Sequence, residues 1–232
     1  MNNAVCIISA IASNYGHFTY DERYSQLLET IDSIKQYLPN SDIFLFDTSD
    51  DPILPEHVLE LNQRVYKAFI LENDMVISNM KKAYKDIDAN LLHKKTVGEL
   101  RAMVIMTQIL STQPKKYETV FKISGRYKLN GKFNENRFKQ DAIVTGNITM
   151  WFDEYIMPIR LWAFPFKEIE GLKNTFNFLY NSTLNALITE EKLEVIEFSF
   201  LRFARENHIP HIQLEVLGLE GPKGLDGYII YE

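Results

Sequence analysis

Short apolar runs alternate with amphipathic segments along the first half of the chain, and this alternation restricts the fold more than any other feature. Runs of this length and composition are typical of strands buried inside a parallel sheet. The amphipathic segments carry apolar side chains at spacings of three and four residues, which predicts helices. The expected strands are residues 5–11, 42–47, 66–71 and 120–123, and the expected helices are residues 20–37, 55–65 and 96–110, the last with Thr96 as its cap.

Strand followed by helix, repeated, predicts an α/β fold with a mostly parallel sheet flanked by helices. The second half of the chain has a more mixed pattern, whose strands need not be parallel. Strands are expected there at 142–151, 158–164 and 212–217, and helices at 168–188 and 193–207. No linker or internal repeat divides the chain, so we expect a single domain over residues 1–232.

Charge and cysteine usage narrow the class of protein. The formal net charge is -6, which disfavours a nucleic-acid partner because phosphate binding calls for a basic balance. Cys6 is the single cysteine, so no internal disulfide can form, and this usage fits a reducing compartment. The apolar start at 5–12 is too short to span a bilayer and lacks the basic region of a secretion signal. We therefore expect a cytoplasmic protein without a transmembrane segment.

Ligands of open α/β sheets collect at the carboxyl ends of the strands. That rule selects residues 9–14, 47–51, 72–74 and 124–130. The common phosphate-binding patterns GxGxxG and GxxxxGK[ST] are missing from the sequence, and so is the hydrolase pattern GxSxG. An ordinary dinucleotide site, a P-loop and a serine-hydrolase site are therefore disfavoured.

The most informative segment is residues 96–133, TVGELRAMVIMTQILSTQPKKYETVFKISGRYKLNGKF. A helix bearing Gly and Arg is followed by a short loop and a strand that ends in Ser124-Gly125-Arg126-Tyr127. This layout resembles that of many GT-A-fold glycosyltransferases, in which the corresponding strand ends in an Asp-x-Asp motif. The chain is similar to a group of glycosyltransferase-like proteins related to lipopolysaccharide-synthesis enzymes of the WavE type, in which that strand ends in a Ser-Gly-Arg-Tyr-like sequence. Glu197 within an apolar helix and the run 217–227 also resemble that group.

The resemblance implies a GT-A-like (Rossmann-like) domain with a nucleotide-binding half at 1–130 and an acceptor-side half at 131–232. It also implies a glycosyltransferase of polysaccharide biosynthesis that transfers a sugar from a nucleotide-sugar donor to a glycan acceptor. Two alternatives stay open. One is a degenerate domain that binds sugars or nucleotides without catalysis. The other is a nucleotidyltransferase, which the 9–17 loop disfavours because it has one glycine and no Arg or Lys.

The strand end at Ser124, Gly125 and Arg126 departs from the family pattern in one respect. An Asp-x-Asp motif holds a Mg²⁺ or Mn²⁺ ion that neutralises the sugar diphosphate, whereas a guanidinium can bind a phosphate directly through two hydrogen bonds. We expect Arg126, with Arg101 or Lys122, to replace the charge of a divalent metal, and we expect no metal site. The alternative interpretation is a structural ion pair of Arg126 at the strand end.

Further nucleotide contacts are expected at the ends of the first two strands. Ser9, Ala10 and Ile11 follow the first strand, where this fold places the nucleotide and where the backbone alone can contact it. Asp47 ends the second strand and is expected near the ribose or the base. The alternative for Asp47 is a turn or cap residue, because Asp favours local hydrogen bonds in loops.

A glycosyl transfer with inversion needs a carboxylate to accept the proton of the attacking hydroxyl. Glu197 is the first candidate, because it interrupts the apolar run 195–198 and partial burial would raise its pKa. Asp153 is the second, because Trp151 and Phe152 before it could form a platform for a sugar ring. The alternatives are a carboxylate facing the dipole at a helix start for Glu197 and core packing for the two aromatic residues.

Overall fold

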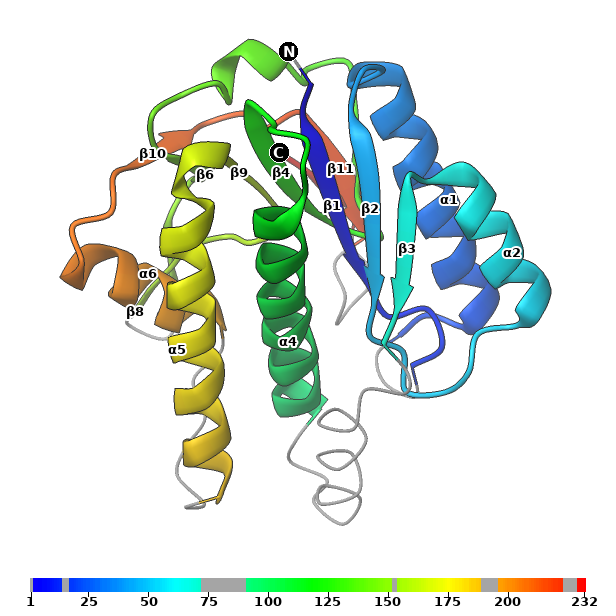
Figure 1. The fold of residues 1–232 in the computed structure, drawn as a ribbon, viewed down its shortest axis with the longest axis horizontal. Helices are drawn as coiled ribbons and strands as arrows, with labels where there is room; N and C mark the ends of the chain where they lie inside the picture. The colour runs from blue at the N-terminus through cyan, green and yellow to red at the C-terminus, as the bar shows by residue number, and fades with distance from the viewer. Residues whose placement is uncertain (1, 14–16, 72–90, 152–153, 189–195, 223–228) are drawn as a thin grey trace.

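The computed structural model describes residues 2–13, 17–71, 91–151, 154–188, 196–222 and 229–232. Its largest element is a seven-stranded sheet, which Figure 1 shows between two layers of helices. In order across the sheet, the strands are β10 (His211–Leu214), β6 (Ile143–Gly146), β9 (Leu161–Pro165), β4 (Thr119–Ser124), β1 (Ala4–Ser9), β2 (Asp42–Asp47) and β3 (Lys67–Ile70).

The sheet is mostly parallel, as the sequence predicts. β1 pairs in parallel with β2 on one side and with β4 on the other, and β2 pairs in parallel with β3. β10 and β6 are also parallel to each other, whereas β9 runs antiparallel to both β4 and β6. Each antiparallel pair of this sheet therefore involves β9, a strand from the second half of the chain.

The order of the strands creates a switch point beside β1. The chain steps from β1 to β2 and β3 in one direction across the sheet, and then returns to place β4 on the opposite side of β1. In doubly wound sheets, the loops at such a point diverge and leave a crevice outside the carboxyl ends of the strands. A ligand site is therefore expected outside the carboxyl ends of β1 and β4.

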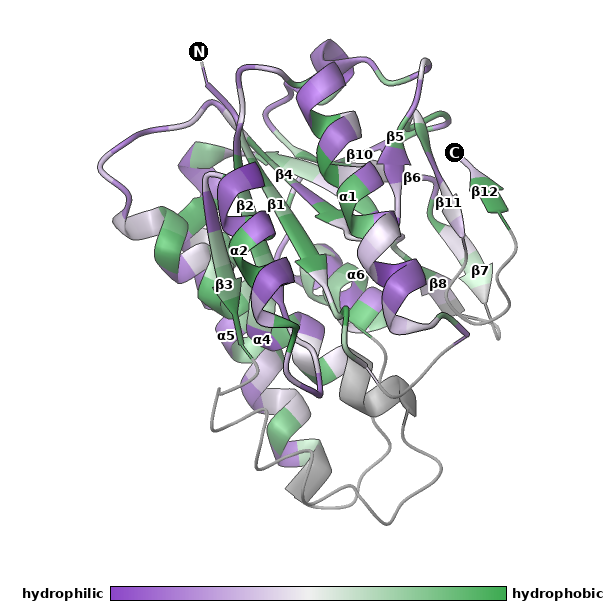
Figure 2. Cartoon of the chain, turned by 90° about the vertical axis from the view of Figure 1, so that its right-hand side faces the viewer, coloured by the Kyte–Doolittle hydropathy of each residue, from purple (hydrophilic) through white to green (hydrophobic). Residues whose placement is uncertain are grey.

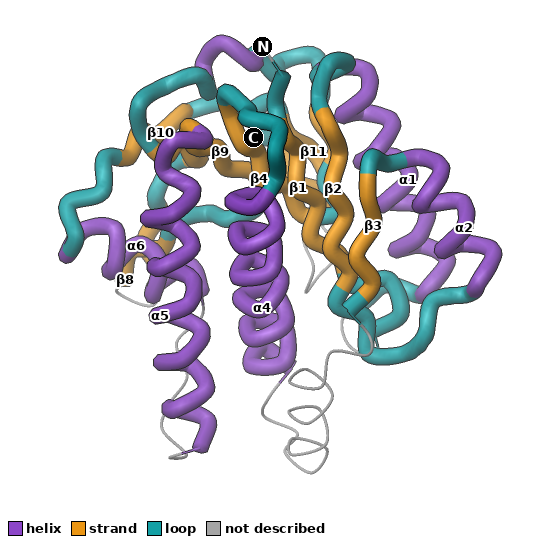
Figure 3. The backbone as a smooth tube through the Cα atoms, viewed as in Figure 1, coloured by secondary structure: helices purple, strands orange, loops and turns teal. Residues whose placement is uncertain are grey.

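Helices cover both faces of the sheet, as the tube view in Figure 3 makes clear. On one face lie α1 (Tyr20–Tyr37) and α2 (Pro55–Arg64), and on the other lie α4 (Leu91–Thr112) and α5 (Ile169–Ile188). α6 (Ile196–Glu206) packs beside the short strand β8 (Glu154–Ile156). α1 begins with a capping box, in which the Thr19 hydroxyl accepts a hydrogen bond from the Glu22 amide and the Glu22 carboxylate accepts one from the Thr19 amide.

The core divides into two parts because successive strand side chains point to opposite faces. On β1, Cys6 and Ile8 pack toward the α4 and α5 layer, and Val5 and Ile7 pack toward the α1 layer. Among the described residues, Trp162 has the largest fully buried side chain, and its ring lies against aromatic rings of α5 and α6. Figure 2 shows apolar residues along the central strands, between helices whose faces alternate in polarity.

Two smaller sheets and two short helices complete the described fold. Their bounds are β5 (Lys128–Leu129), β11 (Leu219–Pro222) and β12 (Ile229–Tyr231) in one sheet, β7 (Thr149–Trp151) and β8 in the other, and the 3₁₀ helices η2 (Glu135–Arg137) and η3 (Phe166–Glu168). None of the helices in the described ranges combines the length and the apolar character needed to cross a bilayer.

The observed elements match the expected ones closely in the first half and less closely later. α1 and β2 have the predicted bounds. The predicted start of the next long helix was wrong, because α4 already begins at Leu91 and Thr96 lies inside it rather than capping it. The expected strand at 142–151 is divided into β6 and β7, and β11 lies in the glycine-rich tail where no strand was expected.

Candidate functional site

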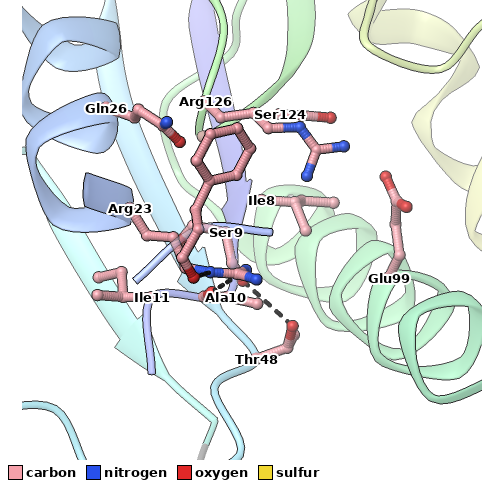
Figure 4. Close-up of a pocket in the computed structure, with 12 residues that line it drawn as sticks. Ile8, Ser9, Ala10, Ile11, Arg23, Gln26, Thr48, Glu99, Ser124 and Arg126 are labelled. Carbon is pink, nitrogen blue, oxygen red and sulfur yellow. Dashed lines mark hydrogen bonds between the residues drawn. The ribbon is translucent and has the colours of Figure 1, made fainter. Parts of the chain in front are cut away.

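A cavity of about 80 Å³ opens at the switch point, where the carboxyl ends of β1 and β4 face the first turns of α1 and the side of α4. Figure 4 shows the side chains that surround it. The lining residues are Ile8, Ser9, Ala10, Ile11, Phe18, Arg23, Gln26, Thr48, Glu99, Ser124, Gly125 and Arg126. The cavity therefore lies where the fold rule places a ligand.

Most of the nucleotide-contact residues expected from the sequence meet in this one cavity. The end of β1 and the end of β4 each contribute three consecutive residues to the wall, namely Ser9, Ala10 and Ile11, and Ser124, Gly125 and Arg126. The two segments are more than a hundred residues apart in the sequence. The parallel pairing of β1 with β4 brings them side by side, because the register aligns Ile8 with Ser124.

Gly125 allows this close approach of the two strand ends. A Cβ atom built at Gly125 would lie 2.8 Å from the Cβ of Ser9 and 3.3 Å from side-chain atoms of Ile7 and Leu27. The Gly125 amide also donates a hydrogen bond to the Ile8 carbonyl oxygen. A side chain at this position would therefore force β4 away from β1 or displace α1.

Asp47 supports the cavity from behind instead of lining it. Its side chain is fully buried, so the expected direct contact with a ribose or base is not what the structure provides. One carboxylate oxygen accepts hydrogen bonds from the Ser9 hydroxyl at 2.5 Å and the Ile11 amide at 3.1 Å, and the other accepts one from the Ser49 amide at 2.9 Å. Asp47 therefore fixes the loop that follows β1, which is the local hydrogen-bonding role left open as its alternative.

Lys122 is also buried behind the wall, which corrects its expected role as a phosphate ligand. Its side chain is 0% exposed, and its ammonium donates three hydrogen bonds, to Oε1 of Glu99 at 2.6 Å, to the Ile159 carbonyl at 2.7 Å and to the Ser124 hydroxyl at 3.1 Å. An ammonium has three protons to donate. Lys122 therefore positions two residues that do line the cavity, Glu99 and Ser124, and has no proton left for a ligand.

Glu99 is a wall residue that the sequence patterns did not single out. It lies on α4, its side chain is 10% exposed, and it faces the cavity from the side opposite the loop after β1. The hydrogen bond and ion pair with Lys122 hold its carboxylate in place. A lysine within the apolar strand run 120–123 was the one signal that could have predicted a buried acidic partner, because an unpaired buried ammonium is strongly unfavourable.

Arg126 presents its guanidinium to the cavity. Its Nε atom is buried without a hydrogen-bond partner, and Arg126 forms no ion pair with any residue in the described ranges. Its guanidinium lies 5.4 Å from the ring centroid of Tyr127, a contact that orients the side chain. Oε1 of Gln26, across the cavity, is likewise buried without a partner among the described residues. Buried polar atoms are nearly always paired, so these two atoms mark a place suited to a polar ligand.

Among the described residues that line the cavity, guanidinium groups outnumber carboxylates. Arg23 and Arg126 both contribute guanidinium groups to the wall, and the carboxylate of Glu99 is matched by the ammonium of Lys122. Arg23 also donates hydrogen bonds to the carbonyl oxygens of Phe18 and Ala10, which shapes the loop after β1. A concave site with two guanidinium groups favours an anionic ligand.

The donors at the end of β4 do not fit the divalent metal that the glycosyltransferase resemblance implies. Ser124 offers a hydroxyl already engaged by Lys122, Gly125 offers no side chain, and Arg126 carries a positive charge. Divalent magnesium or manganese calls for carboxylate oxygens. Within the described ranges, no group of three or more His, Cys, Asp or Glu side chains could hold a metal ion.

The remaining expected site residues lie elsewhere or outside the described ranges. Glu197 is in the first turn of α6, beside β8, and does not line the cavity. Arg101 lies on α4, with its guanidinium 5.7 Å from the ring centroid of Tyr180 on α5, and does not line it either. Asp153 falls outside the described residues. The expected general base is therefore not located by the structure.

A second hollow of about 330 Å³ shares Phe18 with the cavity as a lining residue. Its other lining residues are Ala12, Ser13, Thr19, Tyr20, Asp51, Pro52 and Leu54. The Ser13 hydroxyl is buried there without a partner among the described residues. Burial raises the pKa of the Tyr20 phenol, so this group stays a neutral hydroxyl.

Comparison of the sequence with models of protein families finds no match, and comparison with curated proteins finds none either. The resemblance to GT-A-fold glycosyltransferases thus stays a prediction. The proposal for the function therefore rests on the geometry of the cavity.

Proposed function

We propose that this chain is a GT-A-like glycosyltransferase that binds a nucleotide-sugar donor in the switch-point cavity and transfers its sugar to a glycan acceptor. The observation that carries the proposal is Arg126, whose buried Nε has no hydrogen-bond partner among the described residues, at the strand end where the resemblance expects Asp-x-Asp. In this proposal Arg126, with Arg23 nearby, binds the diphosphate directly and supplies the positive charge that a metal ion supplies in metal-dependent enzymes.

The sizes of the two hollows support a ligand with more than one part. The cavity is smaller than the 300–1,000 Å³ usual for a drug-sized ligand, so it would enclose only the diphosphate and the part of the sugar nearest to it. The second hollow, which shares Phe18 with the cavity, is large enough for a nucleoside. A nucleotide sugar has this division into a nucleoside, a diphosphate and a sugar, and the loop after β1 runs between the two spaces.

Binding without catalysis is the second candidate, and one observation favours it. The first candidate for the general base, Glu197, does not line the cavity. Among the described residues that line the cavity, Glu99 is the one with a carboxylate, and it is held by Lys122. A domain that retains the donor site but lacks a base for the acceptor hydroxyl would bind nucleotide sugars and not transfer the sugar.

The test is thermal denaturation of the protein with UDP, GDP, ADP and dTDP and with their hexose conjugates, each in EDTA. A ligand that binds only the folded state stabilises it by about 2.7 kcal/mol at one hundred times its Kd. Stabilisation in EDTA supports direct recognition by Arg126, and stabilisation that needs Mn²⁺ contradicts it. The absence of stabilisation by every nucleotide contradicts the proposed function itself.

Two variants sharpen this test. Arg126→Gln keeps a side chain of similar length but removes the charge, and we expect it to abolish the stabilisation by nucleotides. Arg101→Gln is the matched control, since Arg101 lies on α4 outside the cavity. Release of the nucleoside diphosphate from the bound conjugate, measured with glycan acceptors, then separates a transferase from a domain that only binds.

A further inference from the structure

Among the charged side chains in the wall of the cavity, two have opposite sign and face each other. In Figure 4 the guanidinium of Arg126 and the carboxylate of Glu99 point toward one another across the cavity. No ion pair joins them, since Arg126 has none with any described residue. The cavity therefore offers a ligand both a strong hydrogen-bond donor and a strong acceptor, at opposite sides.

Glu99 is built into the fold as an acceptor. Lys122 reaches it from inside the sheet, and the same ammonium is fixed by the Ile159 carbonyl and the Ser124 hydroxyl. Burial of the ammonium is strongly unfavourable without such partners. The ion pair with the ammonium of Lys122 holds the carboxylate of Glu99 at the cavity surface, with its side chain 10% exposed.

A charged carboxylate accepts hydrogen bonds and cannot donate them. A phosphate also only accepts at neutral pH, so Glu99 repels the diphosphate that Arg126 attracts. The group that fits beside Glu99 is one that donates hydrogen bonds, and sugar hydroxyls are donors. A sugar that bears its own carboxylate would bring a second negative charge into the cavity that Glu99 lines.

We propose that Glu99, held by Lys122, is the specificity-determining residue that binds the hydroxyl groups of the donor sugar and selects neutral sugars over uronic acids. This inference rests on the proposed function, because it takes the diphosphate to lie at Arg126. It assigns the two ends of the cavity to the two parts of the donor: Arg126 contacts the diphosphate and Glu99 contacts the sugar.

The test compares the Kd of a nucleoside diphosphate with the Kd of its hexose conjugate, for example UDP with UDP-glucose. The nucleotide is the one that stabilises the wild-type protein in the thermal denaturation test. Glu99→Gln keeps the shape of the side chain but removes the charge. We expect it to leave the Kd of the diphosphate unchanged and to raise that of the conjugate about tenfold or more, as the loss of hydrogen bonds to a charged group requires. Arg126→Gln, the control, should weaken both ligands by a similar factor.

The uronic-acid conjugate of the same nucleotide, UDP-glucuronate in this example, gives an independent measurement. The wild-type protein should bind it at least tenfold more weakly than the glucose conjugate, and Glu99→Gln should narrow that difference. Glu99→Asp shortens the side chain by one methylene group and retains its charge. This variant should therefore still bind the uronic-acid conjugate more weakly than the glucose conjugate. It serves as the second variant if Glu99→Gln is poorly folded by circular dichroism.

Different outcomes separate the inference from the proposed function. If the wild-type protein binds a diphosphate and Glu99→Gln weakens the diphosphate and the conjugate equally, or weakens neither, the role of Glu99 in sugar recognition is overturned while the nucleotide site stands. If the wild-type protein binds no nucleotide, the proposed function fails and the inference falls with it.

Discussion

The ammonium of Lys122 lies 2.6 Å from a carboxylate oxygen of Glu99, and this buried ion pair joins the centre of the sheet to the wall of the cavity. Lys122 comes from β4 and Glu99 from α4, so the pair also fixes a helix against the strand beneath it. Its side chains are 0% and 10% exposed. Removing one partner of an ion pair this buried is strongly destabilising, because the charge of the other partner is then left uncompensated.

The first prediction follows from that effect. Lys122→Met removes the ammonium that pairs with the carboxylate of Glu99, whose side chain is 10% exposed, and we expect the free energy of unfolding to fall by about 3 to 5 kcal/mol. Lys128→Met is the control, because Lys128 pairs with Glu29 on the protein surface and its removal should cost less than about 1 kcal/mol. Urea denaturation measures both values. Equal losses for the two variants would contradict the prediction.

The sequence predicted the positions of the elements better than it predicted the partners within the site. Spacings of three and four residues predict α1 with its observed bounds, since the apolar side chains at those spacings are the ones that face the core. The direction of β9 could not be predicted, because an apolar run indicates a strand and says nothing of its orientation. The parallel pairing of β1 with β4 follows from the α/β pattern, and that is why the two expected strand-end segments do meet in one cavity.

Side-chain roles depend on contacts between distant residues, and there the sequence was less informative. Lys122 and Asp47 both occur at strand positions near the predicted site, and both proved to be buried supports. Their burial depends on which face of the sheet the helices cover, which no local pattern records. Glu99 was missed because a single acidic residue on a helix is usually solvated, and only its distance from Lys122 distinguishes it.

Asp47 gives the second prediction. Its carboxylate accepts three hydrogen bonds in the buried loop region, from the Ser9 hydroxyl and from the amides of Ile11 and Ser49. Asp47→Asn removes the charge and places an amide group opposite donors, so we expect a loss of about 3 kcal/mol in the free energy of unfolding. The variant should also lose nucleotide binding, because the loop from Ser9 to Ile11 forms a wall of the cavity.

Asp141→Asn is the control for Asp47→Asn. Asp141 pairs with Lys167 on the protein surface, where its side chain is 83% exposed, and its substitution should change stability by less than about 1 kcal/mol. Urea denaturation and nucleotide titration are the two measurements. A stable Asp47→Asn protein with normal nucleotide binding would show that the loop keeps its shape without these hydrogen bonds.

The contact between α1 and α2 gives the third prediction, which concerns pH. The Tyr24 hydroxyl donates a hydrogen bond to the Glu60 carboxylate at 2.6 Å, and this bond, with a second one from Arg64, lowers the pKa of Glu60 below its usual value of 4.5. A carboxyl whose pKa is lower in the folded state adds stability above its unfolded pKa and loses it as the pH falls through the folded value. The stability contributed by Glu60 is therefore present at pH 6 and declines below about pH 4.5.

Tyr24→Phe removes the larger of the two causes of that shift. The melting temperature of the variant should accordingly fall less steeply than that of the wild-type protein between pH 5 and pH 3. Tyr37→Phe, on the same helix, should retain the wild-type slope, since its hydroxyl makes no hydrogen bond with a described residue. Parallel curves for Tyr24→Phe and the wild-type protein would mean that the hydrogen bond is absent in solution.

Gly125 gives the last prediction, which tests the packing that forms the cavity. A methyl group at this position would meet the Ser9 Cβ at 2.8 Å, and that atom belongs to the backbone-proximal part of a side chain already held by Asp47. Neither Ser9 nor the neighbouring Ile7 can move without disturbing β1, which pairs with β2 on one side and with β4 on the other. We expect Gly125→Ala to lower the free energy of unfolding by about 1 to 3 kcal/mol, as overpacking does.

Gly131→Ala is the matched control, because a Cβ at Gly131 has nothing within 4 Å, and it should be neutral or slightly stabilising. Urea denaturation of both variants, followed by nucleotide titration, decides the matter: if Gly125→Ala is as stable as Gly131→Ala and binds nucleotide normally, the close approach of β4 to β1 is not what shapes the cavity.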